Sequence, residues 1–134
     1  MSQPPLPRPT NAELEILRVL WDRGTGTVRD VYETLAKRVP EGEASGYTTI
    51  LKLMQIMTEK GLVERDEDAR AHVYKPKIPR EKTQRAIVGH LMDRVFAGSA
   101  AELMMQALAA KEASPEEIRE LREMLDRYEK GAGK

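Results

Sequence analysis

The chain has 134 residues, of which 40% are hydrophobic and 4% aromatic, and its 22 basic and 22 acidic side chains give a net charge of zero. Such a chain can form one compact core, or a small domain with a helical extension, but it lacks the basic excess usual in nucleic-acid-binding domains. The absence of cysteine excludes disulfides, thiolate metal sites and cysteine nucleophiles. Because the sequence has neither a signal-peptide pattern nor an apolar run approaching about 18 residues, we expect a cytoplasmic protein with no membrane partner.

Capping signals divide most of the chain into helices. In four places a Ser or Thr precedes an acidic residue by three positions, as in the capping box of a helix N-terminus. The pairs are Thr10 with Glu13, Thr27 with Asp30, Ser99 with Glu102, and Ser114 with Glu117. Together with apolar spacing, they predict helices over about residues 11–23, 28–38, 47–60, 80–96, 100–111 and 115–130. The proline-rich residues 1–9 are expected to form a flexible arm, and residues 131–134 a frayed tail.

The helix expected over residues 47–60 has two distinct faces. An apolar stripe predicts its buried side and consists of Ile50, Leu53, Met54 and Met57. The opposite face is narrow and polar, and it holds Thr48, Lys52, Gln55 and Glu59, with Leu51 beside it. Hydrogen-bonding groups with an apolar contact for the thymine methyl suit the reading of base edges. The predicted base-reading residues are Thr48, Leu51, Lys52 and Gln55. The alternative is a solvated stripe on an ordinary core helix.

A hairpin is expected after this helix. A glycine ends the helix, and two short strands follow over about residues 62–65 and 71–75, around the polar loop 66–70. The order of helix, glycine and hairpin indicates a winged helix-turn-helix. We therefore predict a mainly α fold with a small β-hairpin: a winged helix-turn-helix DNA-binding domain over residues 10–76, then a helical dimerisation domain over residues 77–130.

Several residues around this helix and hairpin are candidates for contact with the DNA backbone. They are Thr27, Arg29, Tyr47, Lys60, Arg70, His72 and Tyr74. Some have a second interpretation. Thr27 also fits a plain helix cap, Tyr47 fits packing against the neighbouring helix, and Lys60 fits a charge that complements the helix dipole. Arg70, in the loop of the expected hairpin (the wing), equally fits a residue that only contacts solvent.

The last three expected helices carry apolar stripes that about 55 residues cannot hide by packing only on themselves. A second copy of the chain is the simplest partner, so we predict a homodimer. The predicted dimerisation residues are Ile87, Leu91, Val95, Leu103, Ala107, Leu108, Leu121 and Leu125.

Catalytic and metal sites find little support in the sequence. The two histidines, His72 and His90, lie on different expected elements without a nearby acidic cluster at ligand spacing. The serines near helix starts fit caps, and no glycine-rich phosphate loop is present. We therefore predict no catalytic activity, no metal and no cofactor.

Five runs of residues resemble the penicillinase and methicillin-resistance repressor family. The runs are NAELEILRVLW (11–21), TVRDVY (27–32), YTTI (47–50), KGLV (60–63) and RAHVY (70–74). The resemblance covers about residues 10–128. It implies a winged-helix domain, a helical dimerisation domain, and repression by binding of a homodimer to a palindromic operator in double-stranded DNA.

The chain departs from the family pattern at two points. In the antibiotic-responsive members, induction involves cleavage in the fifth helix between an Asn and a Phe, and the matching positions here are Gln106 and Ala107. The resemblance therefore leaves a sensor or protease partner open. The copper-responsive branch has a cysteine-rich site that this chain lacks. Another interpretation of the neutral charge is a winged-helix module that contacts proteins rather than DNA.

Overall fold

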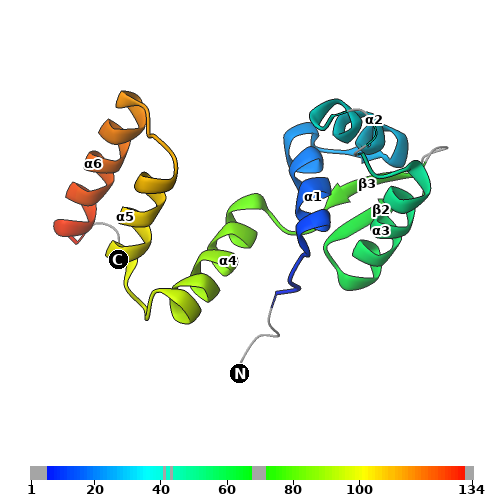
Figure 1. Ribbon diagram of the computed structural model, residues 1–134. Coiled ribbons are helices and arrows are strands. Elements are labelled where there is room, and N and C mark those ends of the chain that lie inside the picture. The colour runs from blue at the N-terminus through cyan, green and yellow to red at the C-terminus, as the bar shows by residue number, and fades with distance from the viewer. Residues whose placement is uncertain (1–5, 41, 43, 68–71, 132–134) are drawn as a thin grey trace, which may run out of the picture. The chain divides into compact units, whose positions relative to one another are not determined.

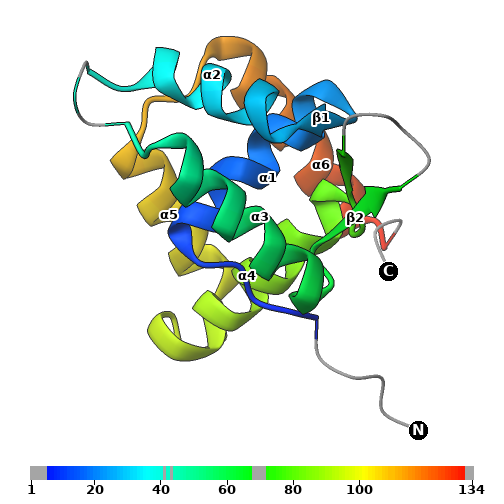
Figure 2. The ribbon, with the colours of Figure 1, turned by 90° about the vertical axis from the view of Figure 1, so that its right-hand side faces the viewer.

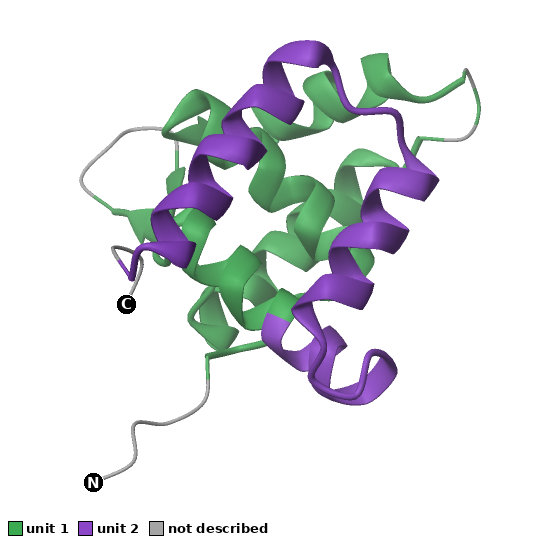
Figure 3. Cartoon of the chain, turned by 90° about the vertical axis from the view of Figure 1, so that its left-hand side faces the viewer, with its two compact units in different colours: residues 1–88 green, residues 89–134 purple. Residues whose placement is uncertain are grey.

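The computed structural model describes residues 6–40, 42, 44–67 and 72–131. Its elements, in chain order, are α1 (Asn11–Arg23), β1 (Gly26–Thr27), α2 (Val28–Arg38), α3 (Tyr47–Lys60), β2 (Val63–Asp66), β3 (Val73–Pro76), α4 (Arg80–Val95), α5 (Ala100–Ala110) and α6 (Pro115–Glu129) (Figure 1). The predicted mainly α fold with a small hairpin is confirmed. The chain divides into two compact units, Met1–Val88 and Gly89–Lys134 (Figure 3).

Local capping chemistry explains why the helices begin where the sequence predicts. Reciprocal capping boxes form at Thr10, Thr27 and Ser114, each with the acidic residue three positions later. At Ser99 only one of the two bonds is made, from the Glu102 backbone N–H to the serine Oγ at 3.1 Å. Helix α3 differs from these four, because its N-cap is Gly46 and no side chain caps it.

The wing belongs to a three-stranded antiparallel sheet with the strand order β1-β3-β2. Strands β2 and β3 form the predicted hairpin, with Arg65 opposite Tyr74. Strand β1 pairs Gly26 with Tyr74 on the other side of β3. Strand β1 has no signal in the sequence, because two residues between helices carry no alternation of apolar and polar side chains.

The hydrophobic core lies in the first unit, where α1, α2 and α3 pack beside the sheet (Figures 1 and 2). Its buried members are Ile16, Leu17, Val19, Leu20, Val28, Val31, Ile50, Met54, Met57, Leu62, Val63 and Tyr74. These residues come from helix stripes at three- and four-residue spacing, from the inward positions of β2 and β3, and from Leu62 between α3 and β2, so one core holds α3 and the hairpin together.

The boundary between the two units lies inside α4, after Val88. The sequence pattern predicts a domain boundary at residue 76, because Pro76 and Pro79 interrupt the chain there. The difference has a physical reason, since the segment after Pro76 bonds back to the first unit. The Trp21 indole N–H donates to the Ile78 carbonyl at 3.1 Å, and Thr83 is buried.

The second unit is helical and open to solvent. Neither α5 nor α6 contains a buried residue, although both carry large apolar side chains. Val95, Met105, Leu125 and Tyr128 expose half or more of their surface. No helix among the described residues has the length and apolar character needed to span a bilayer.

Candidate nucleic-acid interface

Helix α3 presents one buried face and one exposed polar face, as its sequence predicts. Ile50, Met54 and Met57 are at most 2% exposed and lie in the core. Thr48, Lys52 and Gln55 are exposed. Leu51 differs from these three, because it is half-buried and packs against the core. The structure therefore gives Leu51 a packing role at the margin of the polar face.

Two of the predicted backbone-contact residues come together at the N-terminus of α3. The Arg29 guanidinium lies over the Tyr47 ring, 5.4 Å from its centroid. The rings of Tyr47 and Tyr32 also make an edge-to-face contact, with centroids 5.8 Å apart and planes inclined by 75°. Arg29 forms an exposed ion pair with Glu33 at 3.7 Å. This cluster places a cation and a phenol hydroxyl beside the uncapped start of α3, where backbone N–H groups favour anions.

Tyr32 is a member of this cluster that was not among the predicted site residues. It is half-buried and packs against the core while also contacting Tyr47. No sequence spacing signals this pairing, because residues 32 and 47 lie on different helices, separated by the α2–α3 connection.

Thr27 has the capping role that sequence reasoning kept as its alternative. Its Oγ1 accepts from the Asp30 backbone N–H at 3.0 Å, and Asp30 Oδ2 accepts from the Thr27 backbone N–H at 3.0 Å. The bond from the Thr27 backbone, with Arg23 nearby at 3.3 Å, lowers the pKa of Asp30 despite partial burial. Thr27 therefore organises the start of α2, which carries Arg29.

Lys60 lies in the last turn of α3, as its interpretation as a charge that complements the helix dipole requires, and it also makes contacts that the sequence did not predict. Its ammonium donates to Glu13 Oε1 at 2.7 Å and to the Arg8 carbonyl at 3.0 Å. The Glu13 side chain is only 3% exposed. Burial raises the pKa of Glu13, but hydrogen bonds from Lys60 and from the Thr10 backbone outweigh that effect, so its pKa is lowered. Lys60 thus ties the C-terminus of α3 to the N-terminus of α1.

The wing residues divide into exposed and buried positions. His72 is exposed, as a DNA contact requires. Tyr74 is only 2% exposed, and the prediction that it contacts DNA is wrong, because its ring lies in the hydrophobic core where α1 packs against β3. Arg70 lies outside the described residues. Its place in the wing stays a prediction.

Two basic residues on the wing strands were missed by the sequence analysis. Arg65 pairs with Glu67 at 3.0 Å, and Lys75 pairs with Glu64 at 3.6 Å. Hydrogen bonds to Glu67 and to Tyr74 raise the pKa of Arg65. The exposed positions alternating with Tyr74 along β3 were the available signal for Lys75.

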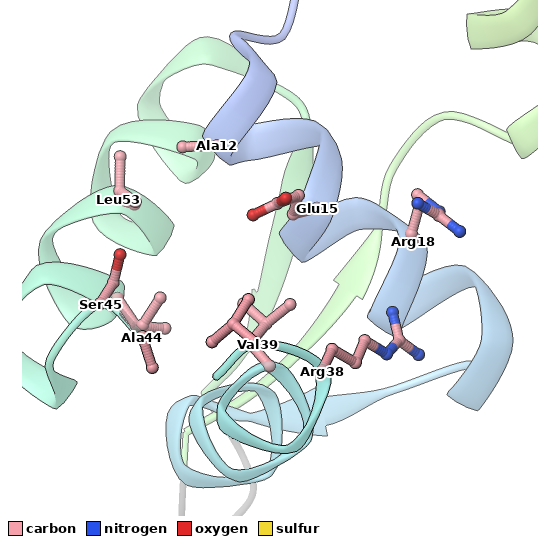
Figure 4. Close-up of a pocket in the computed structure, with 10 residues that line it drawn as sticks. Ala12, Glu15, Arg18, Arg38, Val39, Ala44, Ser45 and Leu53 are labelled. Carbon is pink, nitrogen blue, oxygen red and sulfur yellow. The ribbon is translucent and has the colours of Figure 1, made fainter. Parts of the chain in front are cut away.

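A pocket of about 260 Å³ lies between α1, α2 and α3 (Figure 4). Its wall combines apolar side chains such as Leu53 and Val39 with the charged residues Glu15, Arg18 and Arg38. Among the described residues, no group of three or more His, Cys, Asp or Glu side chains is arranged to hold a metal ion.

Comparison with known proteins gives consistent matches. The family model described as penicillinase repressor matches residues 9–127. The penicillinase repressor of Bacillus licheniformis is 24% identical, over 92% of this chain and 93% of that protein. The transcriptional regulator BlaI of Mycobacterium tuberculosis (strain H37Rv) is 30% identical, over 81% of this chain and 88% of that protein.

Two solved structures are also similar. The solution structure of the DNA-binding domain of the repressor BlaI matches 60% of this chain and 90% of that domain, with 25% identity and a TM-score of 0.48. The B. licheniformis BlaI monomeric form in complex with the blaP half-operator matches 57% of this chain and 88% of that one, with 25% identity and a TM-score of 0.47.

Proposed function

The chain belongs to the penicillinase repressor family, a family of transcriptional repressors and not of enzymes, and we propose that it represses transcription as a homodimer bound to a palindromic DNA operator. In each protomer the exposed face of α3 enters the major groove, where Thr48, Lys52 and Gln55 meet base edges. The wing residue His72 approaches the adjacent backbone.

The observation that carries this proposal is the division of α3 into two faces by the core. Ile50, Met54 and Met57 anchor one face with at most 2% exposure, so the helix cannot rotate without exposing them. The opposite face therefore points outward in a fixed orientation. The Arg29–Tyr47 contact at one end and the Lys60–Glu13 ion pair at the other support the same orientation.

In this proposal the affinity for DNA comes from contacts of individual side chains, rather than from a high net positive charge. The net charge is zero, so nonspecific attraction to DNA is weak. Arg29 and Lys52 are nevertheless exposed near the polar face. Two-fold symmetry doubles every such contact. The logarithm of the binding constant then falls linearly with the logarithm of the salt concentration, with a slope of about −0.9 for each phosphate neutralised.

A binding titration with matched controls tests the base-reading face. A duplex selected from a random-sequence library by the wild-type protein serves as the operator probe. We expect Lys52→Ala and Gln55→Ala each to weaken operator binding by about 1–3 kcal/mol. The controls Lys82→Ala and Gln84→Ala remove exposed residues of the same types from α4 and should bind as the wild type does.

Normal binding by both α3 variants would contradict the assignment of the face. Failure of the wild-type protein to enrich any duplex, or to retard sonicated DNA at low salt, would favour the alternative of a protein-contact module.

Homodimerisation is supported by the exposed apolar side chains of the second unit. This unit spans Gly89–Lys134, a size at which a chain buries only a modest share of its own surface, and neither α5 nor α6 has a buried residue. Of the predicted dimerisation set, Leu91, Val95, Ala107, Leu108 and Leu125 are exposed in the second unit and Leu103 and Leu121 are half-buried there, while Ile87 is exposed near the end of the first unit. A second copy provides a matching apolar surface for all of them.

Sedimentation velocity tests the dimer. Leu125→Glu places a charge within the apolar stripe of α6 and should shift the protein to monomer at micromolar concentration. Arg119→Glu introduces the same side chain on the opposite side of α6 and should leave the dimer intact. A wild-type protein that sediments as a clean monomer would refute the dimer directly.

The induction mechanism stays a prediction. Gln106 and Ala107, which match the family's cleavage pair, are exposed within α5. A sensor or protease partner is not assigned by these positions.

A further inference from the structure

The segment that leads from the wing into α4 is bonded to the winged-helix unit at several separate points. The Lys77 backbone N–H donates to the Leu62 carbonyl at 3.0 Å, where the chain leaves α3. The Trp21 indole N–H donates to the Ile78 carbonyl at 3.1 Å. Two residues later, Arg80 begins α4. This segment is therefore held on the unit rather than forming a free linker.

Arg80 makes two contacts between the start of α4 and α1. Its guanidinium lies over the Trp21 ring at 5.8 Å from the centroid, and its Nη2 is 2.5 Å from Asp22 Oδ1. Asp22 Oδ2 also pairs with Arg38 at 3.7 Å, at the end of α2. One carboxylate thus connects α1, α2 and the first residue of α4.

The first half of α4 consequently belongs to the DNA-binding unit. Thr83, one turn beyond Arg80, is only 5% exposed, and the unit continues to Val88. We call the contacts among Trp21, Asp22, Ile78 and Arg80 the α4 anchor. Its residues lie on α1 and at the start of α4, and none belongs to the polar face of α3.

We propose that the α4 anchor is a specificity-determining element for operator geometry: Trp21 and Arg80 are positioning residues that restrict the separation of the two recognition helices of a dimer. This inference rests on the proposed homodimer bound to a palindrome. Half-sites in such palindromes lie about one helical turn, roughly 34 Å, apart. The avidity of a dimer that binds both half-sites depends on a linkage whose length matches that separation. A loosened linkage lowers the effective concentration of the second DNA-binding unit once the first has bound.

Binding to spacer variants of the operator separates this role from folding and from base reading. The probes are the selected operator, the same duplex with two base pairs inserted or removed at its centre, and a half-operator. The full-length variants are Arg80→Gln, which removes the ion pair and the ring contact, and Trp21→Phe, which removes the indole donor. Arg85→Gln is the matched control, because Arg85 is exposed on the same helix and has no ion pair within the described residues.

We expect both anchor variants to bind the half-operator within about twofold of wild type, since the α3 face is unchanged. We expect each variant to reduce the preference for the natural spacing over the altered spacing by about fivefold. In Arg80→Gln the reduction comes from the loss of one exposed cation–π contact and one ion pair, and in Trp21→Phe it comes from the loss of one hydrogen bond. Arg85→Gln should keep the wild-type preference. Thermal melting identifies any variant that has lost its fold.

Three results overturn the proposal: an unchanged spacing preference in a folded Arg80→Gln protein, an equal loss of affinity on the half-operator, or the same loss in Arg85→Gln. The proposed function fails separately, when the wild-type protein itself selects no palindromic duplex.

Discussion

Replacement of Glu13 by glutamine is a direct test of how α3 is held in place. Glu13 Oε1 accepts from both the Lys60 ammonium at 2.7 Å and the Thr10 backbone N–H at 2.8 Å. The side chain is 3% exposed, whereas that of Lys60 is 32% exposed. Glutamine retains an acceptor oxygen for Thr10 but removes the charge that faces Lys60.

The size of the effect follows from this difference in exposure. Breaking a fully buried ion pair costs about 3–5 kcal/mol, because an unpaired charge remains inside the protein. Lys60 reaches water in part, so we expect Glu13→Gln to lower the free energy of unfolding by about 2 kcal/mol. For a unit of this size, that loss corresponds to a fall in Tm of about 10 °C.

The effect should depend on pH in one direction. The pKa of Glu13 is lowered in the folded protein from an ordinary value of 4.5. A carboxylate whose pKa is lowered on folding contributes stability above its unfolded pKa and loses it as pH falls through the folded pKa. The difference between wild type and Glu13→Gln should therefore be complete at pH 7 and shrink progressively below about pH 4.5.

Urea unfolding followed by tryptophan fluorescence measures this quantity. The chain has a single tryptophan, Trp21 on α1, so the signal reports on the winged-helix unit. Glu15→Gln is the matched control, because Glu15 is an exposed glutamate on the same helix. Equal stability of the two variants at pH 7, or a difference that persists undiminished at pH 3, would refute the argument.

Three further predictions concern the core, the wing and the second unit. Met54→Ala should cost about 3 kcal/mol in urea unfolding because Met54 is 0% exposed, whereas Met105→Ala, at 61% exposure, should cost under about 0.5 kcal/mol. Tyr74→Phe should leave operator affinity unchanged in the titration, while His72→Ala should weaken it; the opposite order would contradict the burial of Tyr74. Ser114→Ala removes the α6 cap and should destabilise that helix by about 1 kcal/mol in thermal melts followed by circular dichroism, and an unchanged melt would exclude this role.

Much of the fold was predictable because its signals are local. A capping box involves residues three apart, so Thr10 with Glu13 marks a helix start whatever the helix later packs against. The buried stripe of α3 is equally local, since side chains at three- and four-residue spacing share one face in any helix. For the same reason the exposure of Thr48, Lys52 and Gln55 was predicted correctly.

The roles of individual polar residues were less predictable, because they depend on partners distant in sequence. Lys60 is an exposed cation in its own helix, and only the packing of α1 against α3 brings Glu13 to it. Tyr74 belongs to a hairpin that by itself has two open edges. Its burial follows from the packing of α1 against β3, which places the Tyr74 ring in the hydrophobic core.

The sequence by itself determined the helices, their caps, the hairpin and the two faces of α3, because backbone propensity and side-chain periodicity act over a few residues. The tertiary structure alone decided which charged groups are paired and where the first compact unit ends. The reason is that the burial of a side chain and its charged partners depend on which elements pack together in the folded protein. Two prolines suggested a boundary at residue 76, but the contacts of Trp21 and Arg80 carry the unit into α4, to Val88.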